Sequence, residues 1–148
     1  MQGRFTPRFP EKYKGDVDNI IYRSSWELSA MMRFDKDPNI VEWASEEVSE
    51  GMVIPYINPV DGRWHRYFVD FKIKNKRGET FLIEIKPASQ VNKPQERNSK
   101  GRKRQGRVFL GEMVEWTKNQ AKWEYARKFA EERNWKFVVL TEKELGIK

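Results

Sequence analysis

Two acidic residues and a lysine, Asp70, Glu84 and Lys86, stand where two neighbouring stretches of the chain alternate between apolar and polar residues. If both stretches are strands, their period of two places all three side chains on one face of a sheet. A three-residue turn at 76–78, with Gly78 in the left-handed position of a bulged hairpin, would set Asp70 directly opposite Glu84. Their Cβ atoms would then lie about 5 Å apart, and carboxylates that close repel unless a cation or a shared proton holds them. The sequence therefore predicts a divalent metal site beside the Lys86 ammonium.

The expected ligands of this site are carboxylate oxygens, which suit Mg²⁺ or Mn²⁺ better than zinc. The chain has no Cys and one His, which excludes thiolate and multi-histidine sites and a thiol nucleophile. A bound divalent ion lowers the pKa of a water molecule and neutralises a scissile phosphate, while Lys86 would position the nucleophile or stabilise the transition state. The pattern predicts metal-assisted phosphodiester hydrolysis. The alternative is a solvated sheet face on which Lys86 balances Glu84, and a shift of one residue in register would separate the two acids.

Three further polar residues could assist this chemistry. Glu27 could supply another ligand or orient a metal-bound water, but Ser24 and Glu27 also fit an S-x-x-E capping box, which by itself explains a glutamate there. His65 could act as a general base or contact a phosphate, or it could be a partly exposed neighbour at the start of a strand. Gln120, on the helix that follows the Glu84 strand, could reach the site or face solvent.

The excess of positive charge is confined to one part of the chain. There are 29 Lys and Arg against 22 Asp and Glu, and residues 86–107 hold eight of the basic residues with one acid. A segment at about residues 88–108 lacks stacking aromatics, so we expect it to be mobile and to contact DNA or RNA phosphates without reading sequence. A solvated loop or a localisation signal is the alternative. The candidate DNA-binding residues are Lys93, Arg97, Lys100, Arg102, Lys103, Arg104 and Arg107.

The length of 148 residues leaves room for one domain, residues 1–148, and its polar N-terminal stretch predicts neither a signal peptide nor a membrane span. Within the strand expected over 64–74, Tyr67, Val69, Phe71 and Ile73 would share one apolar face. The order α-β-β-β-α-β predicts an α/β fold with a mixed sheet flanked by helices. The expected elements are a helix over 24–34, an extended piece over 41–44, strands over 52–57, 64–74 and 81–85, a helix over 111–133, a strand over 136–140 and a short capped helix from Thr141.

Asp70 followed by Glu84-Ile85-Lys86, with Glu27 on a preceding helix and a crossover helix afterwards, resembles the PD-(D/E)xK nuclease superfamily and its restriction-endonuclease-like core. Longer strings resemble the head completion proteins of T-even-type tailed phages, and this similarity extends over nearly the whole chain. These strings are KYKGD at 12–16, IYRSSWE at 21–27, PVDG at 59–62, HRYFVDF at 65–71, EIKP at 84–87, NQAKWE at 119–124 and LTE at 140–142.

The resemblance implies a head completion nuclease, a Mg²⁺-dependent or Mn²⁺-dependent endodeoxyribonuclease that acts after DNA packaging and before tail attachment. Carried over by position, Asp70 and Glu84 would bind the metal and Ile85 could offer its carbonyl oxygen. Lys86 would be the catalytic lysine, and Glu27 matches the acidic residue of the first helix. One departure is Val69, which stands where the superfamily name has Pro, and a proline there contributes no ligand.

The same resemblance implies double-stranded DNA as substrate, the phage portal or other head completion proteins as partners, and no membrane. It implies action in the cytoplasm of the infected bacterial host, with retention in the virion as a further expectation. A non-catalytic adapter that binds DNA or the portal during capsid assembly is the alternative from another class. A structure-selective RNA enzyme is the third.

Overall fold

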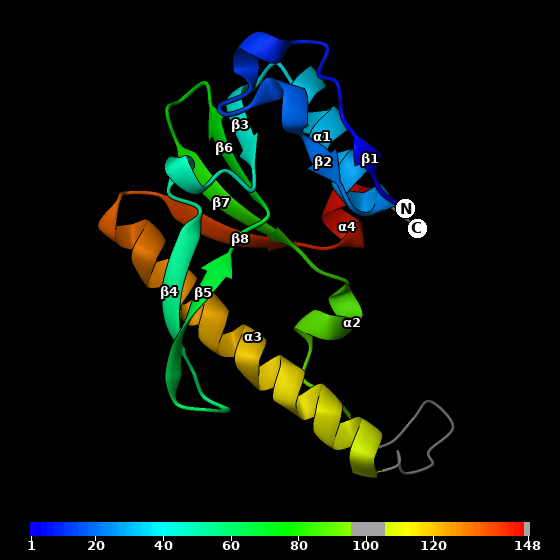
Figure 1. The fold of residues 1–148 in the computed structure, drawn as a ribbon, viewed down its shortest axis with the longest axis vertical. Helices are drawn as coiled ribbons and strands as arrows, with labels where there is room; N and C mark the ends of the chain where they lie inside the picture. The colour runs from blue at the N-terminus through cyan, green and yellow to red at the C-terminus, as the bar shows by residue number, and fades with distance from the viewer. Residues whose placement is uncertain (96–105, 147–148) are drawn as a thin grey trace.

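The computed structural model describes residues 1–95 and 106–146, and its centre is a four-stranded mixed sheet (Figure 1). The strands are β1 (Gly3–Arg4), β2 (Ile21–Tyr22), β3 (Ile40–Ser45), β4 (Val53–Asn58), β5 (Arg63–Phe68), β6 (Phe71–Asn75), β7 (Thr80–Ile85) and β8 (Lys136–Leu140). The helices are α1 (Ser25–Lys36), α2 (Ala88–Val91), α3 (Gly106–Glu132) and α4 (Glu142–Leu145), with 3₁₀ turns at Pro10–Lys12, Val17–Asn19 and Val48–Glu50.

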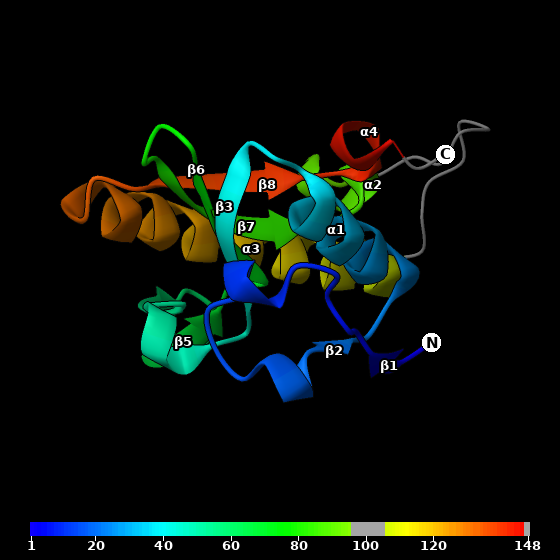
Figure 2. The same cartoon turned by 90° about the horizontal axis from the view of Figure 1, so that it is seen from above.

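The central sheet has the order β3-β6-β7-β8, in which β3, β6 and β7 are antiparallel neighbours and β8 is parallel to β7. The predicted order α-β-β-β-α-β is confirmed as α1, β3, β6, β7, α3 and β8. Its first strand is β3, which was expected only as a short extended piece. The strand expected over 52–57 is β4, which pairs with β5 in a hairpin set apart from the central sheet (Figure 2).

The pairing of β6 with β7 confirms the register expected from the turn. Phe71 pairs with Ile83 and Ile73 with Phe81, and Gly78 lies in the left-handed region at a φ of 85°. This register is set locally, because the turn type and loop length of a hairpin determine which residues face each other. The ladder ends at the pair of Phe71 with Ile83, because β6 begins at Phe71, so the expected pairing of Asp70 with Glu84 stays a prediction.

The strand expected over 64–74 is not continuous. It breaks between Phe68 and Phe71, so that β5 belongs to the hairpin and β6 to the central sheet. The prediction of one apolar face is therefore wrong: Tyr67 and Val69 pack in the core beneath α3, whereas Phe71 and Ile73 pack in the core beneath α1. The break restarts the alternation of side chains, which allows both apolar pairs to be buried on different sides of the sheet.

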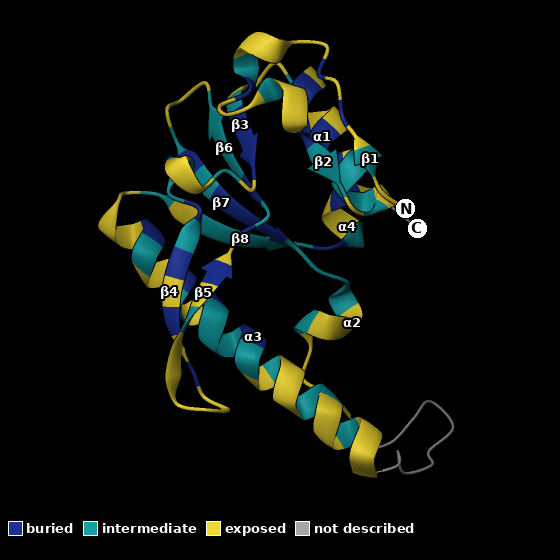
Figure 3. Ribbon diagram, viewed as in Figure 1, coloured by how far each residue is buried: buried dark blue, intermediate teal, exposed yellow. Residues whose placement is uncertain are grey.

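Two cores lie on the two faces of the central sheet, as the alternation along β7 shows. Leu82 belongs to the core with Trp123 of α3, and Ile83 to the core with Phe34 of α1. Each helix buries one side against the sheet because it carries one apolar stripe. The first turns of α3 extend past the sheet and are mostly exposed (Figure 3).

The two ends of the basic segment lie in helices. Helix α3 begins at Gly106, five residues before the expected start, and α2 occupies Ala88–Val91. Both ends of the segment predicted to be mobile are thus helical. Residues 96–105 lie outside the described residues, so the mobility of its centre stays a prediction.

Helix α4 forms hydrogen bonds both with α1 and with the chain just after β7. The guanidinium of Arg33 donates to the carbonyls of Glu144 (2.7 Å) and Leu145 (3.2 Å). The backbone N–H of Ala88 donates to the Glu142 carboxylate at 3.0 Å. The predicted capping box is present, because the Thr141 hydroxyl accepts from the backbone of α4 and the Glu144 carboxylate accepts from the Thr141 N–H. Among the described residues, no helix is both long and apolar enough to cross a membrane.

Candidate active site

The predicted site residues lie where β7 ends and where the chain enters β6. Asp70 immediately precedes β6, Glu84 and Ile85 close β7, and Lys86 follows directly. The backbone N–H of Lys86 donates to the Leu140 carbonyl at 3.0 Å, which extends the pairing with β8 by one residue. A cavity of about 340 Å³ opens here between α1 and the sheet. It is lined by Ser24, Ser25, Trp26, Glu27, Asp70, Ile85 and Pro87.

The Asp70 carboxylate is held from one side only. Its Oδ2 accepts the backbone N–H of Ile85 at 2.8 Å, while Oδ1 has no hydrogen-bond partner among the described residues. Burial raises the pKa of Asp70 to about 6; the Ile85 hydrogen bond and the Lys86 charge lower it, and the negative charges of Glu27 and Glu46 raise it further. Asp70 is thus a carboxyl group that would gain from a cation at its free oxygen.

Glu84 is buried between β5 and α3, with 8% of its surface exposed. Its Oε2 accepts from the Tyr67 hydroxyl and from the Trp123 indole Nε1, the latter at 2.8 Å. Burial raises the pKa of Glu84, whereas the Trp123 hydrogen bond and the charges of Lys86 and Lys122 lower it. Two donors on one oxygen fix the orientation of this carboxylate and leave Oε1 turned toward Lys86, whose Nζ lies 3.8 Å away.

Sequence reasoning placed Tyr67 on an apolar face and gave neither Tyr67 nor Trp123 a part in the site. The available signal is that a buried Tyr or Trp normally requires a partner for its O–H or N–H. A single acidic residue on the inner strand of the sheet is the natural acceptor for both. Their distance from Glu84 along the chain, 17 and 39 residues, hides the connection.

Lys86 acts electrostatically on both carboxyl groups. Its ammonium lowers the pKa of Asp70 and of Glu84. One positive charge therefore acts on both acids. Lys86 also lines a second cavity of about 600 Å³ between α2 and α3, together with Trp116 and Asn119.

The other partners of the two acids lie on different sides of the sheet. Asp70 shares its cavity with Glu27 of α1, whereas Glu84 binds Trp123 of α3. In the described part of the chain, no group of three or more His, Asp or Glu side chains is placed to hold a metal ion. The sharing of one ion by Asp70 and Glu84 stays a prediction.

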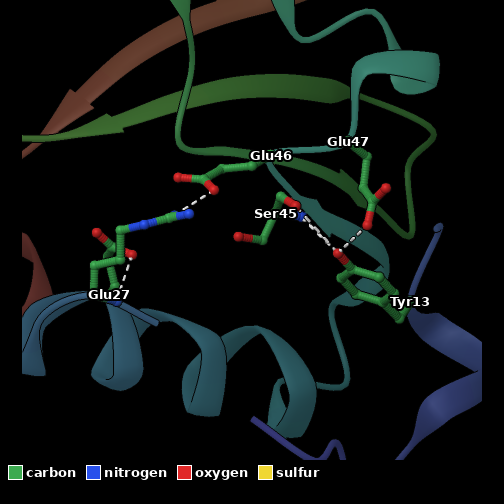
Figure 4. Close-up of polar contacts among 6 residues, drawn as sticks. Tyr13, Glu27, Ser45, Glu46 and Glu47 are labelled. Atoms are coloured by element: carbon green, nitrogen blue, oxygen red, sulfur yellow. Dashed lines mark hydrogen bonds and ion pairs between the residues drawn. The ribbon is translucent and has the colours of Figure 1, made fainter. Parts of the chain in front are cut away.

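Glu27 reaches the site through the first turn of α1. Its backbone N–H donates to the Ser24 hydroxyl (3.1 Å), as the capping box predicts, but its carboxylate accepts the N–H of Arg23 (3.1 Å) instead of that of Ser24. The Arg23 guanidinium in turn pairs with Glu46. Figure 4 shows Glu27 and Glu46 facing each other across this contact. Sequence reasoning did not find Glu46.

Glu46 is placed by an unusual backbone. It follows β3 directly and has a φ of 52°, a left-handed conformation that is uncommon for a residue with a side chain. The residues on both sides are held by Tyr13, whose hydroxyl donates to Glu47 at 2.7 Å and accepts the N–H of Ser45 at 3.2 Å (Figure 4). The N-terminal segment therefore supports the turn that directs Glu46 toward Arg23.

The auxiliary candidates have other contacts. The Nε2 of His65 lies 2.7 Å from Asp61 at the tip of the β4–β5 hairpin. Gln120 is half-buried on α3, and its neighbour Asn119, instead of Gln120, lines the cavity with Lys86. Neither His65 nor Gln120 has a described hydrogen bond to Asp70, Glu84 or Lys86. Their roles stay predictions.

Of the basic candidates, two lie in the described chain. The Nζ of Lys93 is 5.9 Å from the ring centroid of Trp116, and Arg107 is exposed in the first turn of α3. The residues that lie outside the described residues are Arg97, Lys100, Arg102, Lys103 and Arg104.

Comparison with known proteins identifies the family. The TnsA-like endonuclease N-terminal domain matches residues 37–142, a span that contains Asp70, Glu84 and Lys86. The chain belongs to this TnsA-like endonuclease family. The head completion nuclease of Enterobacteria phage T4 is 38% identical over 152 residues, which cover 99% of this chain and 96% of that protein. No solved structure matches the chain.

These matches confirm the two resemblances noted in the sequence, and the TnsA-like endonuclease family confirms the restriction-endonuclease-like fold. Nucleases with this fold generally use divalent metal ions. The family match begins after α1, so it includes the two acids of the sheet but not Arg23 or Glu27. In this endonuclease the α1 side of the cavity is therefore supplied by residues outside the matched span.

Proposed function

We propose that this endonuclease cuts DNA with a divalent metal ion during phage head completion, after DNA packaging and before tail attachment. The observation that carries the proposal is the pair of carboxyl groups with raised pKa, half-buried Asp70 and buried Glu84, on both of which the charge of the Lys86 ammonium acts. Perturbed acids beside a cavity are typical of catalytic sites. The family match and the similarity to a head completion nuclease support the same reading.

The donor set suits a hard cation such as Mg²⁺ or Mn²⁺. Among the described residues, the Oδ1 of Asp70 has no hydrogen-bond partner, and the Oε1 of Glu84 lies 3.8 Å from the Nζ of Lys86. Both groups favour ionisation if a cation offsets the cost of burial. The ligands we propose are Asp70, Glu84 and the carbonyl oxygen of Ile85, with Glu27 as a further acidic group on the cavity wall. When bound, such an ion supplies an activated water and neutralises charge on the scissile phosphate.

The remaining steps fall to side chains of the chain itself. Tyr67 and Trp123 hold the Glu84 carboxylate in one orientation, so that little rearrangement is needed when DNA binds. The ammonium of Lys86 is free to neutralise negative charge on a phosphate oxygen as it develops, because its ion pair with Glu84 is long. Arg23 pairs with Glu46, whose negative charge acts on Asp70, and so offsets part of that charge. These are positioning roles, except that of Lys86, which would contact the substrate.

We further propose double-stranded DNA as substrate and the portal or other head completion proteins as partners. The place of action would be the cytoplasm of the infected host, with retention in the virion. The second candidate function is a non-catalytic adapter that binds DNA or the portal. It is favoured by the observation that the partners of Asp70 and Glu84 lie on different sides of the sheet.

Nicking of supercoiled plasmid tests the proposal. The wild type should nick with Mg²⁺ or Mn²⁺ and not with EDTA, whereas Asp70→Asn and Glu84→Gln should lose on the order of 100-fold or more of the rate. Glu124→Gln is the matched control, because this glutamate is exposed on α3 and, in the described part of the chain, forms its ion pair with Lys128.

A wild type that binds DNA but does not nick it with any divalent ion would favour the adapter. Cleavage of RNA without cleavage of DNA would favour the RNA enzyme. Nicking by both carboxylate variants at the wild-type rate would remove the two acids from the mechanism.

A further inference from the structure

The β4–β5 hairpin has one buried face and one exposed face. Ile54, Tyr56 and Tyr67 point into the core beneath α3, with exposures of 1%, 3% and 4%. The outer face is formed by the alternate residues, in three cross-strand pairs. These pairs are Val53 with Phe68, Pro55 with Arg66 and Ile57 with Trp64.

The outer face exposes two large rings. Trp64 is 65% exposed and Phe68 is 50% exposed. Between them on the same face of β5 is Arg66, whose guanidinium carbon lies 5.6 Å from the Phe68 ring centroid. Trp64 packs against Tyr125 of α3 in a T-shaped arrangement, with the ring centroids 6.0 Å apart and the planes at 77°. These rings are therefore braced and yet open to solvent, which costs free energy unless something covers them.

The spacing of this face suits a row of stacked planar groups. Trp64, Arg66 and Phe68 occupy every second position of one strand, so they recur at about 6.7 Å. Two of them are aromatic rings and the third is a planar cation, which also stacks on rings. Aromatic rings and guanidinium planes are the groups on which unpaired bases stack, and this stacking tolerates any base sequence.

The charge and the edges of the hairpin favour nucleic acid over a protein strand. No acid is among the six outer residues, and one of them, Arg66, is a cation. The N–H of Val69 donates to Met52, so by alternation the nitrogen of Pro55 faces the free edge of β4. Because proline lacks an N–H, a further strand could not form a continuous ladder of hydrogen bonds along this edge.

The row leads directly to the candidate active site. β5 ends at Phe68, and the chain reaches Asp70 two residues later. We propose that the outer face of the β4–β5 hairpin, defined by Trp64, Arg66 and Phe68, stacks the unpaired bases of a single-stranded DNA segment next to the bond that is cut. This inference rests on the proposed function for its choice of DNA as the substrate. It adds that the enzyme prefers DNA with a single-stranded tail or gap to a blunt duplex.

Binding of labelled oligonucleotides in EDTA tests the platform without cleavage. The probes are a single strand, a blunt duplex and the same duplex with a single-stranded tail. Trp64→Ala should weaken binding of the single strand and of the tailed duplex by about 5- to 150-fold, and Phe68→Ala should act in the same direction. Blunt-duplex affinity should change by less than about twofold. Trp64→Phe keeps a ring and should retain most of the affinity.

The control is Val60→Ala, which removes an exposed apolar side chain (56%) from the tip of the same hairpin. It should leave all three affinities unchanged. Cross-linking of an iodouracil-containing single strand to Trp64, located by mass spectrometry, provides a second measurement on the wild type and so does not depend on how the variants fold.

Wild-type affinity of Trp64→Ala for all probes, or no cross-link at Trp64, would overturn the platform and leave this face to a protein partner. An equal loss on all three probes would also overturn it, because the effect would then be general. Because binding is measured in EDTA, without cleavage, the oligonucleotide affinities can be interpreted even if the protein does not nick plasmid. Conversely, a failed platform leaves the nicking assay unaffected.

Discussion

Replacing Asp70 by Asn should stabilise the metal-free protein at neutral pH while abolishing its activity. Asn has nearly the same shape, and its amide oxygen can still accept the N–H of Ile85 that Oδ2 now accepts at 2.8 Å. The variant removes only the buried negative charge. The comparison therefore measures how much the ionisable carboxyl group at position 70 lowers the free energy of unfolding.

The size of that cost follows from the pKa of Asp70, which burial raises from 3.8 to about 6. The folded state then binds the proton more tightly than the unfolded chain, so the contribution of Asp70 to stability falls as pH rises from about 4 to about 6. At 1.36 kcal/mol for each pH unit, the loss above pH 6 is about 3 kcal/mol at most. Asp70→Asn should therefore match the wild type near pH 4 and exceed it by up to about 3 kcal/mol at pH 7.5.

Urea unfolding in EDTA at pH values from 4 to 8 measures this difference directly. Glu124→Gln, which removes an exposed charge, should show no such dependence on pH. A metal ion should reduce this difference. At ten times its dissociation constant Mg²⁺ or Mn²⁺ should add about 1.4 kcal/mol to the wild type and less to Asp70→Asn.

The reasoning is refuted if Asp70→Asn is less stable than the wild type at pH 7.5, or if their difference does not change between pH 4 and 8. Either result would mean that the folded state does not disfavour the ionised form of Asp70. Equal stabilisation of both proteins by the ion would place the metal elsewhere.

Two further predictions concern Glu84 and the basic segment. Tyr67→Phe removes a hydrogen-bond donor from buried Glu84, so we expect the pKa of Glu84 to rise further. In urea unfolding, the variant should be less stable than the wild type by about 1.5–3 kcal/mol at pH 7.5 and by less at pH 4. It should also nick plasmid more slowly. Equal losses at both pH values would contradict this account. Replacing Arg102, Lys103 and Arg104 by Ala should lower the slope of log binding constant against log salt by roughly three at most, without altering metal binding, as salt titration would show. An unchanged slope would assign the segment another role.

Much of the site could be predicted because its register is local. The turn at 76–78 determines how β6 faces β7, and that pairing was derived from Gly78 and the alternation on both sides. The N-caps at Ser24 and Thr141 are local in the same sense, since a hydroxyl and the next turn of backbone suffice.

The strand over 64–74 shows where local reasoning fails. Its alternation continues through Val69 without a signal of a break, yet β5 and β6 belong to different sheets. Whether one face or two faces are buried depends on the helices that cover them, and α1 and α3 lie far away in the sequence. The break at Asp70 also releases its side chain from the strand geometry and directs it to the Ile85 N–H.

By itself, the sequence determined the order of elements, the β6–β7 register, and that Asp70, Glu84 and Lys86 come together at one end of the sheet. Each of these depends on periodicity and on turns, which act over a few residues. Only the tertiary structure decided the protonation equilibria of the two acids and the exposure of Trp64 and Phe68. The physical reason is that desolvation and hydrogen-bond donors come from α1, β5 and α3, which packing brings to β7 from distant parts of the chain.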